Sequence, residues 1–193
     1  EDLGLHHLHV LGKKPLFRGI QGWFLRQLGG IPVDQHAAGG VVGQVVEHFK
    51  NDPNFCLALA PEGTRAKVDA LRSGYYEIAK AAGVGQVVLL SAICVQRPLL
   101  AFQKAKLAFE SELAASGLTY SIVRATAFFK SLSGQVARVQ AGKPFLIFGD
   151  GTLTACKPIS DADLGTYLAN CLDDPTRHNR ILPIGGPGPA LTA

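Results

Sequence analysis

A short apolar run is followed by residues that could bind a phosphate group. The run is Phe55–Ala60, and the residues after it include Glu62, Gly63, Thr64 and Arg65. Glycine lets the backbone approach an anion closely, and an arginine guanidinium can bind two phosphate oxygens at once. With the Thr64 hydroxyl as a further donor, this segment is a candidate site for a substrate phosphate. The alternative is a surface turn in which Glu62 and Arg65 pair with each other.

A second group of polar residues follows two other apolar runs. Ser91 stands near the end of Gln86–Ile93, and Arg124 and Thr126 end the run Tyr120–Ala125. Parallel α/β sheets bind ligands beyond the carboxyl ends of their strands, so these side chains are candidates for ligand contacts.

Strands and helices alternate along the chain. Apolar runs predict strands at Leu8–Leu11, Phe55–Ala60, Gln86–Ile93, Tyr120–Ala125, Phe145–Phe148 and Arg180–Ile184. Helical spacing predicts helices at Leu16–Leu28, Val41–Lys50, Ser73–Ala82, Pro98–Ser116, Leu132–Gln140 and Asp161–Leu172. This order is typical of an α/β fold, a parallel sheet covered by helices on both faces.

Composition excludes several classes of function. The chain has 193 residues, 47% of them hydrophobic and 18% charged, which is typical of a globular domain. Its net charge of +4 is spread without a basic stripe, so no nucleic-acid partner is expected. Apolar runs of roughly eight residues are too short for a transmembrane segment, which needs about 20. No signal peptide is visible, and we expect a cytoplasmic protein with at most peripheral membrane contact.

Cysteine and histidine spacing predicts no metal site. The four cysteines are far apart and form no Cys-x-x-Cys pair, which suits a reducing compartment. Cys56, Cys94 and Cys171 lie in apolar runs, where a thiol behaves as a small hydrophobic group. His6, His7 and His9 have no supporting carboxylate or thiol nearby, and we interpret them as an exposed polar segment.

Residues 84–193 resemble the atypical short-chain reductases of the divinyl chlorophyllide 8-vinyl reductase type. The resemblance is carried by Val88–Val95, Phe102–Lys106, Leu118–Arg124, Thr126–Lys130, Phe148–Gly151, Cys156–Ser160 and Leu182–Gly188. It implies NADPH-dependent reduction of the 8-vinyl group of divinyl chlorophyllide in chlorophyll biosynthesis, with chlorophyllide as a small-molecule substrate. It also implies catalytic roles for Ser91 and Lys106 and cofactor contacts from Arg124, Thr126 and Phe128.

Two of these implied roles have structural alternatives. Phe102 and Lys106 have the spacing of a Tyr-x-x-x-Lys pair, but a phenyl ring cannot donate a proton, so Lys106 is left to bind the cofactor ribose. The alternative for Lys106 is a solvated helix face beside Lys104. The alternative for Phe128, as for Phe129, is a place in the hydrophobic core.

Residues 1–83 resemble the glycerolipid acyltransferases of the lysophosphatidic acid acyltransferase type. The resemblance is carried by Gly12–Phe17, Gly22–Phe24, Gly29–Asp34 and Ala60–Arg65. It implies acyl transfer to a lysophospholipid whose phosphate is bound by Glu62, Gly63, Thr64 and Arg65. The His-x-x-x-x-Asp motif that supplies the general base of such enzymes does not occur in the chain, so we expect no acyl transfer.

The two resemblances meet at residues 83 and 84. Both predict a helix, a turn and a strand there, which allows one continuous hybrid sheet built from a Rossmann-like carboxy-terminal half and an acyltransferase-like amino-terminal half. No Gly-x-x-Gly-x-x-Gly stands at a strand-to-helix turn, and we therefore expect NADPH to bind weakly. Three functions stay open: vinyl reduction, acyl transfer, and a non-catalytic α/β scaffold.

Overall fold

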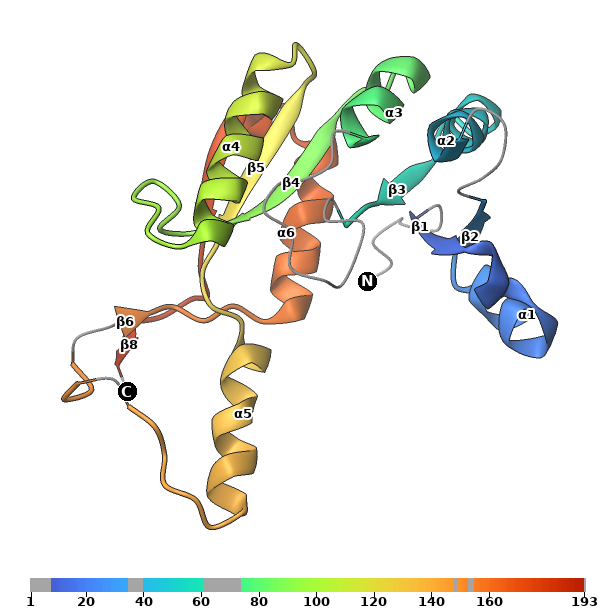
Figure 1. Ribbon diagram of the computed structural model, residues 1–193. Coiled ribbons are helices and arrows are strands. Elements are labelled where there is room, and N and C mark those ends of the chain that lie inside the picture. Colours follow the sequence, from blue (N-terminus) through green and yellow to red (C-terminus); the bar gives the residue numbers. More distant parts are fainter. Residues whose placement is uncertain (1–7, 35–39, 61–73, 148, 153–154, 193) are drawn as a thin grey trace. The chain divides into compact units, whose positions relative to one another are not determined.

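The computed structural model describes residues 8–34, 40–60, 74–147, 149–152 and 155–192. Two compact units are distinguished in it (Figure 1). The first unit comprises residues 1–87 with 116–118, and the second comprises residues 88–115 with 119–193. Each unit is described by itself.

The first unit is a small parallel α/β layer. Its elements are β1 (Leu8–Lys13), the 3-10 turn η1 (Lys14–Phe17), α1 (Gly19–Gln27), β2 (Gly30–Val33), α2 (Gly40–Asn51), β3 (Cys56–Ala58) and α3 (Gly74–Ala82). The strand order is β2-β1-β3, and β1 pairs in parallel with both neighbours. After β2 the chain therefore crosses to the other side of β1, which makes the carboxyl end of β1 a topological switch point.

The hydrophobic core of the first unit lies between this sheet and its helices. The buried residues are Ile31, Val33, Val45 and Ile78, and partly buried side chains of Leu11, Val41, Val42, Phe49, Phe55 and Leu57 pack against them. The apolar residues of α2 recur at helical spacing, which explains why this segment forms an amphipathic helix. Gly29 has a φ of +79°, and a Cβ there would collide with the Leu8 carbonyl oxygen, so glycine is needed where β2 enters the sheet.

The second unit contains a three-stranded sheet in the order β4-β5-β7. Its elements are β4 (Val87–Ala92), α4 (Ala101–Ala115), β5 (Tyr120–Ala125), α5 (Phe129–Gln140), β6 (Ala155–Cys156), α6 (Asp161–Asp173), the 3-10 turn η2 (Pro175–Arg177), β7 (Arg180–Ile184) and β8 (Leu191–Thr192). The strands β5 and β7 are parallel, and β6 pairs with β8 in an antiparallel ribbon.

Successive side chains of β5 face two different helices, α4 and α6. Val123 and Ala125 join Leu164 and Cys171 of α6 in the hydrophobic core, whereas Arg124 faces Glu110 of α4. A strand turns successive side chains to opposite faces, so α4 and α6 cover opposite faces of the sheet. Ser160 caps the amino end of α6, where its hydroxyl accepts a hydrogen bond of 3.0 Å from the Asp163 N–H.

The predicted parallel α/β fold is confirmed, but several local predictions are wrong. Described residues 145–147 form no strand, because their backbone does not pair with a neighbouring strand; the Leu146 backbone bonds the Gln135 side chain instead. Cys94 is exposed rather than part of an apolar core, and it has a φ of +68°.

The expected single sheet is not seen in the described hydrogen bonds. The strands β3 and β4 stand in separate sheets, and most of their residues are half-buried rather than fully buried. The one-sheet arrangement and the domain boundary at residues 83 and 84 therefore stay predictions.

Candidate functional site

A basic pocket lies beside β1 and β2 of the first unit. It has a volume of about 600 Å³ and opens beyond the carboxyl ends of β1 and β2. The lining residues are Lys13, Lys14, Pro15, Phe17, Arg18, Arg26, Val33 and Asp34. Four cationic side chains and a single carboxylate leave an excess of positive charge, which favours an anionic ligand.

The floor of this pocket is the buried ring of Phe17. A Cβ at Gly12 would lie 2.7 Å from the Phe17 ring, and one at Gly30 would lie 2.9 Å from it, so both glycines make room for the ring. Because the ring fills the space beside Gly12, a ligand in the pocket meets side chains rather than the backbone that follows β1. This differs from a glycine-rich phosphate loop, in which backbone N–H groups contact the anion.

The polar groups of the pocket are only loosely bound to one another. The Lys14 ammonium lies 3.4 Å from the Asp34 carboxylate, and these side chains are 70% and 36% exposed. Such an exposed pair contributes little, about 0–1 kcal/mol, and leaves the lysine available to a ligand. The Arg26 guanidinium has more contacts within the protein, because it donates to the Gly22 carbonyl at 3.2 Å and lies over the Phe17 ring.

The backbone of Asp34 is fixed by α2. Its N–H donates to the Gln44 side-chain oxygen at 3.1 Å, and the Gln44 amide donates to the Asp34 carbonyl at 2.8 Å. These two bonds hold the end of β2 in place. The Asp34 side chain thus has a defined position at the rim of the pocket.

The second unit holds a buried ionic cluster between α4 and the strands β4 and β5. Arg124 donates to Glu110 through Nη2 at 2.6 Å and through Nε at 3.1 Å, and the side chains are 11% and 3% exposed. The Ser91 hydroxyl donates to the same carboxylate and is itself buried. The carboxylate of Glu110 therefore satisfies two of the side chains that we predicted to contact a ligand.

Lys106 stands one helical turn before Glu110. Its ammonium donates to the Leu90 carbonyl at 3.2 Å, so the half-buried side chain reaches the carboxyl end of β4. It is not part of a solvated helix face, unlike its exposed neighbour Lys104.

Thr126 and Phe128 lie where the chain leaves β5. The Thr126 hydroxyl donates to the Lys157 carbonyl at 2.5 Å, and the Gly186 N–H donates to the same oxygen at 3.0 Å. A Cβ at Gly186 would collide with the Pro158 carbonyl oxygen, so this crossing of two segments needs glycine. Phe128 packs against the hydrophobic cluster around Ile159, which fits its structural interpretation; its contact with a cofactor stays a prediction.

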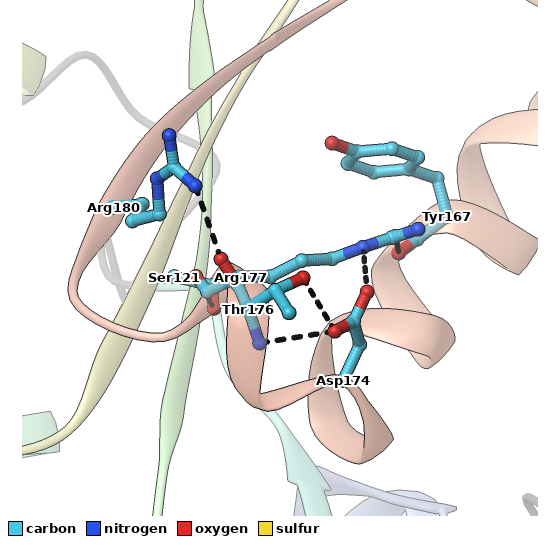
Figure 2. Close-up of polar contacts among 6 residues, drawn as sticks. All are labelled: Ser121, Tyr167, Asp174, Thr176, Arg177 and Arg180. Carbon is cyan, nitrogen blue, oxygen red and sulfur yellow. Dashed lines mark hydrogen bonds and ion pairs between the residues drawn. The ribbon is translucent and has the colours of Figure 1, made fainter.

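A polar cluster at the opposite end of β5 has a structural role (Figure 2). Arg177 forms an ion pair of 2.9 Å with Asp174, stacks over the Tyr167 ring, and its carbonyl accepts from the Ser121 hydroxyl at 2.9 Å. Hydrogen bonds from Thr176 hold the pKa of the Asp174 carboxyl below its usual value. This cluster lies at the amino end of β5, whereas α/β sheets bind ligands beyond the carboxyl ends of their strands.

Some predicted residues are not placed, and others were missed. Glu62, Gly63, Thr64 and Arg65 lie outside the described residues. Glu110 was missed, although it follows Lys106 by four residues and so shares its helix face. The pocket was missed too, although Lys13 and Lys14 directly follow an apolar run. Among the described residues, no group of three His, Cys, Asp or Glu side chains could hold a metal ion.

Comparison with protein families assigns the chain. The model of a family described as NAD(P)H-binding matches residues 41–175. The chain belongs to this NAD(P)H-binding family.

The resemblance to vinyl reductases is also confirmed. A divinyl chlorophyllide a 8-vinyl-reductase of Oryza sativa subsp. indica is 53% identical over 148 residues, or 71% of this chain and 36% of the relative. The Arabidopsis thaliana protein of the same name is 60% identical over 116 residues, or 57% of this chain and 28% of the relative.

Solved structures confirm the Rossmann-like fold. The structures of pinoresinol-lariciresinol and phenylcoumaran benzylic ether reductases match with a TM-score of 0.69 at 20% identity, covering 99% of this chain and 66% of theirs. An NADPH-dependent quinone oxidoreductase from Escherichia coli, complexed with NADPH, matches with a TM-score of 0.63 at 17% identity, covering 96% and 71%. At these identities the likeness concerns the fold alone.

The comparisons also bear on the extent of the chain. It spans about a third of the length of the curated reductases that it matches. The NAD(P)H-binding match runs across residues 83 and 84, and these comparisons offer no support for an acyltransferase origin of residues 1–83. The described part of the chain includes no helix with the length and apolar character that a membrane crossing requires.

Proposed function

We propose that this protein is part of an NADPH-dependent reductase that acts on the vinyl group of divinyl chlorophyllide. The observation that carries the proposal is the 53–61% identity to plant proteins named for this reaction, together with membership of the NAD(P)H-binding family. The names of these relatives place them in the chloroplast. The free cysteines in the structure suit a reducing compartment of this kind.

The basic pocket of the first unit is the proposed site for the phosphates of NADPH. It stands at the carboxyl ends of parallel strands, where α/β sheets bind nucleotides, and it offers the cations Lys13, Lys14 and Arg18. Asp34, at the end of β2, is suited to accept a hydrogen bond from the 3′-hydroxyl of the adenosine ribose, whose 2′ position carries a phosphate in NADPH. The charge and volume of the pocket therefore fit the cofactor, although its residues lie outside the stretch 41–175 that the family model matches.

This pocket modifies the expectation of weak cofactor binding. We expected weak NADPH binding because the chain lacks a glycine-rich turn whose backbone N–H groups contact the pyrophosphate. Here lysine and arginine side chains supply charge-assisted hydrogen bonds in their place. Since the groups are exposed, the resulting affinity depends strongly on ionic strength.

The residues of the second unit divide the remaining roles. NADPH supplies a hydride when bound. Lys106, whose ammonium reaches the carboxyl end of β4, is expected from the resemblance to bind a ribose, and this role stays a prediction. Ser91 already donates its hydroxyl hydrogen to buried Glu110, so we assign it a positioning role instead of proton donation.

A titration with NADPH tests the cofactor site. The double variant Lys13→Ala/Lys14→Ala should bind NADPH at least about tenfold more weakly, because each lost charge-assisted bond is worth about 1.5–3 kcal/mol. The control is Lys50→Ala, an exposed lysine of α2 that pairs with Glu47 outside the pocket. Equal affinity for wild type and the double variant would contradict the proposed site.

A second measurement tests the reaction. Wild-type protein with NADPH and divinyl chlorophyllide should yield the 8-ethyl product, followed by the change in pigment absorbance. NADPH oxidation without any product would contradict the assignment of the substrate.

Acyl transfer is not proposed as a second function. Residues 62–65, which would hold the lysophospholipid phosphate, lie outside the described residues, and the chain lacks the His-x-x-x-x-Asp motif. We expect no transfer of acyl groups to lysophosphatidic acid. Measurable transfer that is abolished by Arg65→Ala would restore the acyltransferase interpretation.

A further inference from the structure

The helix α5 follows the carboxyl end of β5 in the second unit and carries an exposed apolar stripe. It begins four residues after the end of β5, where the Phe129 N–H donates to the Ile159 carbonyl at 3.2 Å (Figure 1). Phe129, Val136 and Val139 are 53%, 59% and 50% exposed. Their spacing of seven and three residues places them on one face of the helix. Among its side chains that the structure describes, α5 buries none.

The chain after α5 returns alongside the helix and adds to this surface. The Gln135 amide donates to the Leu146 carbonyl at 3.0 Å, and its oxygen accepts from the Leu146 N–H at 3.3 Å. Arg138 donates to the Pro144 carbonyl at 2.7 Å. These bonds fix residues 144–147 to the helix, and we name α5 with residues 144–147 the α5 platform.

Six large apolar side chains among the described residues of the α5 platform are exposed. Phe145, Leu146 and Ile147 are each about half exposed, as are the three residues of the helix stripe. Contiguous apolar surface of this kind marks a binding site in a soluble protein. The packing of the platform against its own unit does not account for these side chains.

The charge of the platform favours an anionic partner. Residues 129–147 include Lys130, Arg138 and Lys143 and no Asp or Glu. Lys130 and Lys143 are exposed. A ligand with a broad apolar body and a carboxylate complements both the apolar stripe and these two lysines.

We propose that the α5 platform binds the macrocycle of a carboxylated tetrapyrrole, with its carboxylate facing Lys130 or Lys143. This rests on the proposed function, whose substrate is a flat apolar ring system with a propionate side chain. The platform starts at the carboxyl end of β5, so a ring bound there has one side at the edge where an α/β reductase holds its nicotinamide.

An anionic membrane surface would offer similar chemistry, but the platform fits it less well. Helices that lie in a membrane interface have a polar face rich in Lys and Arg. Only Lys130 and Arg138 of the polar positions of α5 are charged, whereas Ser131, Ser133, Gln135 and Gln140 are not.

The test is a titration with chlorophyllide a without NADPH, followed by the absorbance and fluorescence of the pigment. Val136→Asp should raise the dissociation constant at least tenfold, because it places a carboxylate within the apolar stripe. The matched control is Ala137→Asp, which adds the same charge at the neighbouring exposed position on another side of the helix. Lys130→Gln/Lys143→Gln should weaken binding of chlorophyllide severalfold and leave binding of its methyl ester unchanged.

The outcomes separate this proposal from the proposed function. Circular dichroism establishes that each variant is folded, and NADPH titration of the same variants should give wild-type affinity. If chlorophyllide binds Val136→Asp as well as wild type, or does not bind wild type at all, the platform proposal is overturned. The cofactor site stands in either case if NADPH still binds. A membrane surface would replace the tetrapyrrole as the partner under one further outcome. In that outcome, wild type binds vesicles with anionic lipids, Val136→Asp does not bind them, and neither protein binds chlorophyllide.

Discussion

The two units place cationic side chains at the carboxyl ends of parallel strands, and they use them in opposite ways. In the second unit, Arg124 is 11% exposed, and its Nε and Nη2 atoms donate to the buried carboxylate of Glu110. In the first unit, Lys14 is 70% exposed and its contact with Asp34 is 3.4 Å long. The strand-end position by itself therefore does not make a cation a ligand contact. The number of carboxylates nearby and their burial decide whether the charge is already satisfied.

The largest effect is expected from breaking the buried pair. Glu110→Ala should lower the free energy of unfolding by about 3–5 kcal/mol, because it leaves the Arg124 guanidinium buried without its partner. Urea denaturation followed by circular dichroism measures this change. Glu112→Ala, at an exposed position of the same helix, is the control and should stay within about 0.5 kcal/mol. A loss below 1 kcal/mol for Glu110→Ala would show that water reaches the cluster.

Replacing both charges sharpens the same point. The variant Glu110→Leu/Arg124→Met should recover most of the stability lost in Glu110→Ala, since apolar groups of similar volume often substitute for a buried ion pair. Urea denaturation of the single variants Glu110→Leu and Arg124→Met, beside the double variant, completes the cycle that isolates the coupling between these residues. A double variant as unstable as Glu110→Ala would point to the Ser91 hydroxyl, left without its acceptor, as the main cost.

Salt should distinguish the two regions next. Raising ionic strength shortens the screening length to about 3 Å at 1 M, so the affinity of the exposed pocket for NADPH should fall several-fold between low and high salt. The difference in stability between wild type and Glu110→Ala should hardly change, because a buried pair is screened much less. Calorimetric titrations and urea curves at both salt concentrations measure these quantities. A salt-independent affinity would argue against Lys13 and Lys14 as phosphate contacts.

A smaller effect is expected from the exposed pair in the pocket. Asp34→Asn should change the free energy of unfolding by less than about 1 kcal/mol, since Lys14 and the backbone bonds to Gln44 stay in place. Thermal unfolding is the measurement, and Glu47→Gln in the exposed pair with Lys50 is the control. A loss of unfolding free energy as large as that of Glu110→Ala would show that the exposed pair stabilises the fold as much as the buried pair does.

The smallest effect is expected in the loss of folding stability at acidic pH. The hydrogen bonds from Thr176 lower the pKa of Asp174 in the folded state, so the unfolded state binds the proton more readily. Asp174 therefore contributes stability above its unfolded pKa, near pH 4, and this contribution is lost as the pH falls through the lower folded value. Urea midpoints of Asp174→Asn should show a shallower acid limb than wild type. Identical limbs would mean that other carboxyls account for the loss.

The sequence predicted most of the secondary structure because its signals are local. The observed β5 and β7 have the predicted bounds, and the two helices around Val45 and Leu164 were expected from the spacing of apolar residues. The apolar segment 145–147 was wrongly predicted as a strand. Its composition suits a strand, but a strand also needs a partner, and only the packing shows that it has a helix beside it.

The sequence by itself determined the α/β class and the relation of the carboxy-terminal part to vinyl reductases, because periodicity and motif identity are written along the chain. Only the tertiary structure decided which polar residues are already satisfied. Ser91 and Arg124 meet Glu110 across 19 and 14 residues, and the two walls of the basic pocket are joined by Lys14 and Asp34, 20 residues apart. Such contacts depend on how helices pack on strands, and the type of a residue does not reveal whether its charge is buried or open to a ligand.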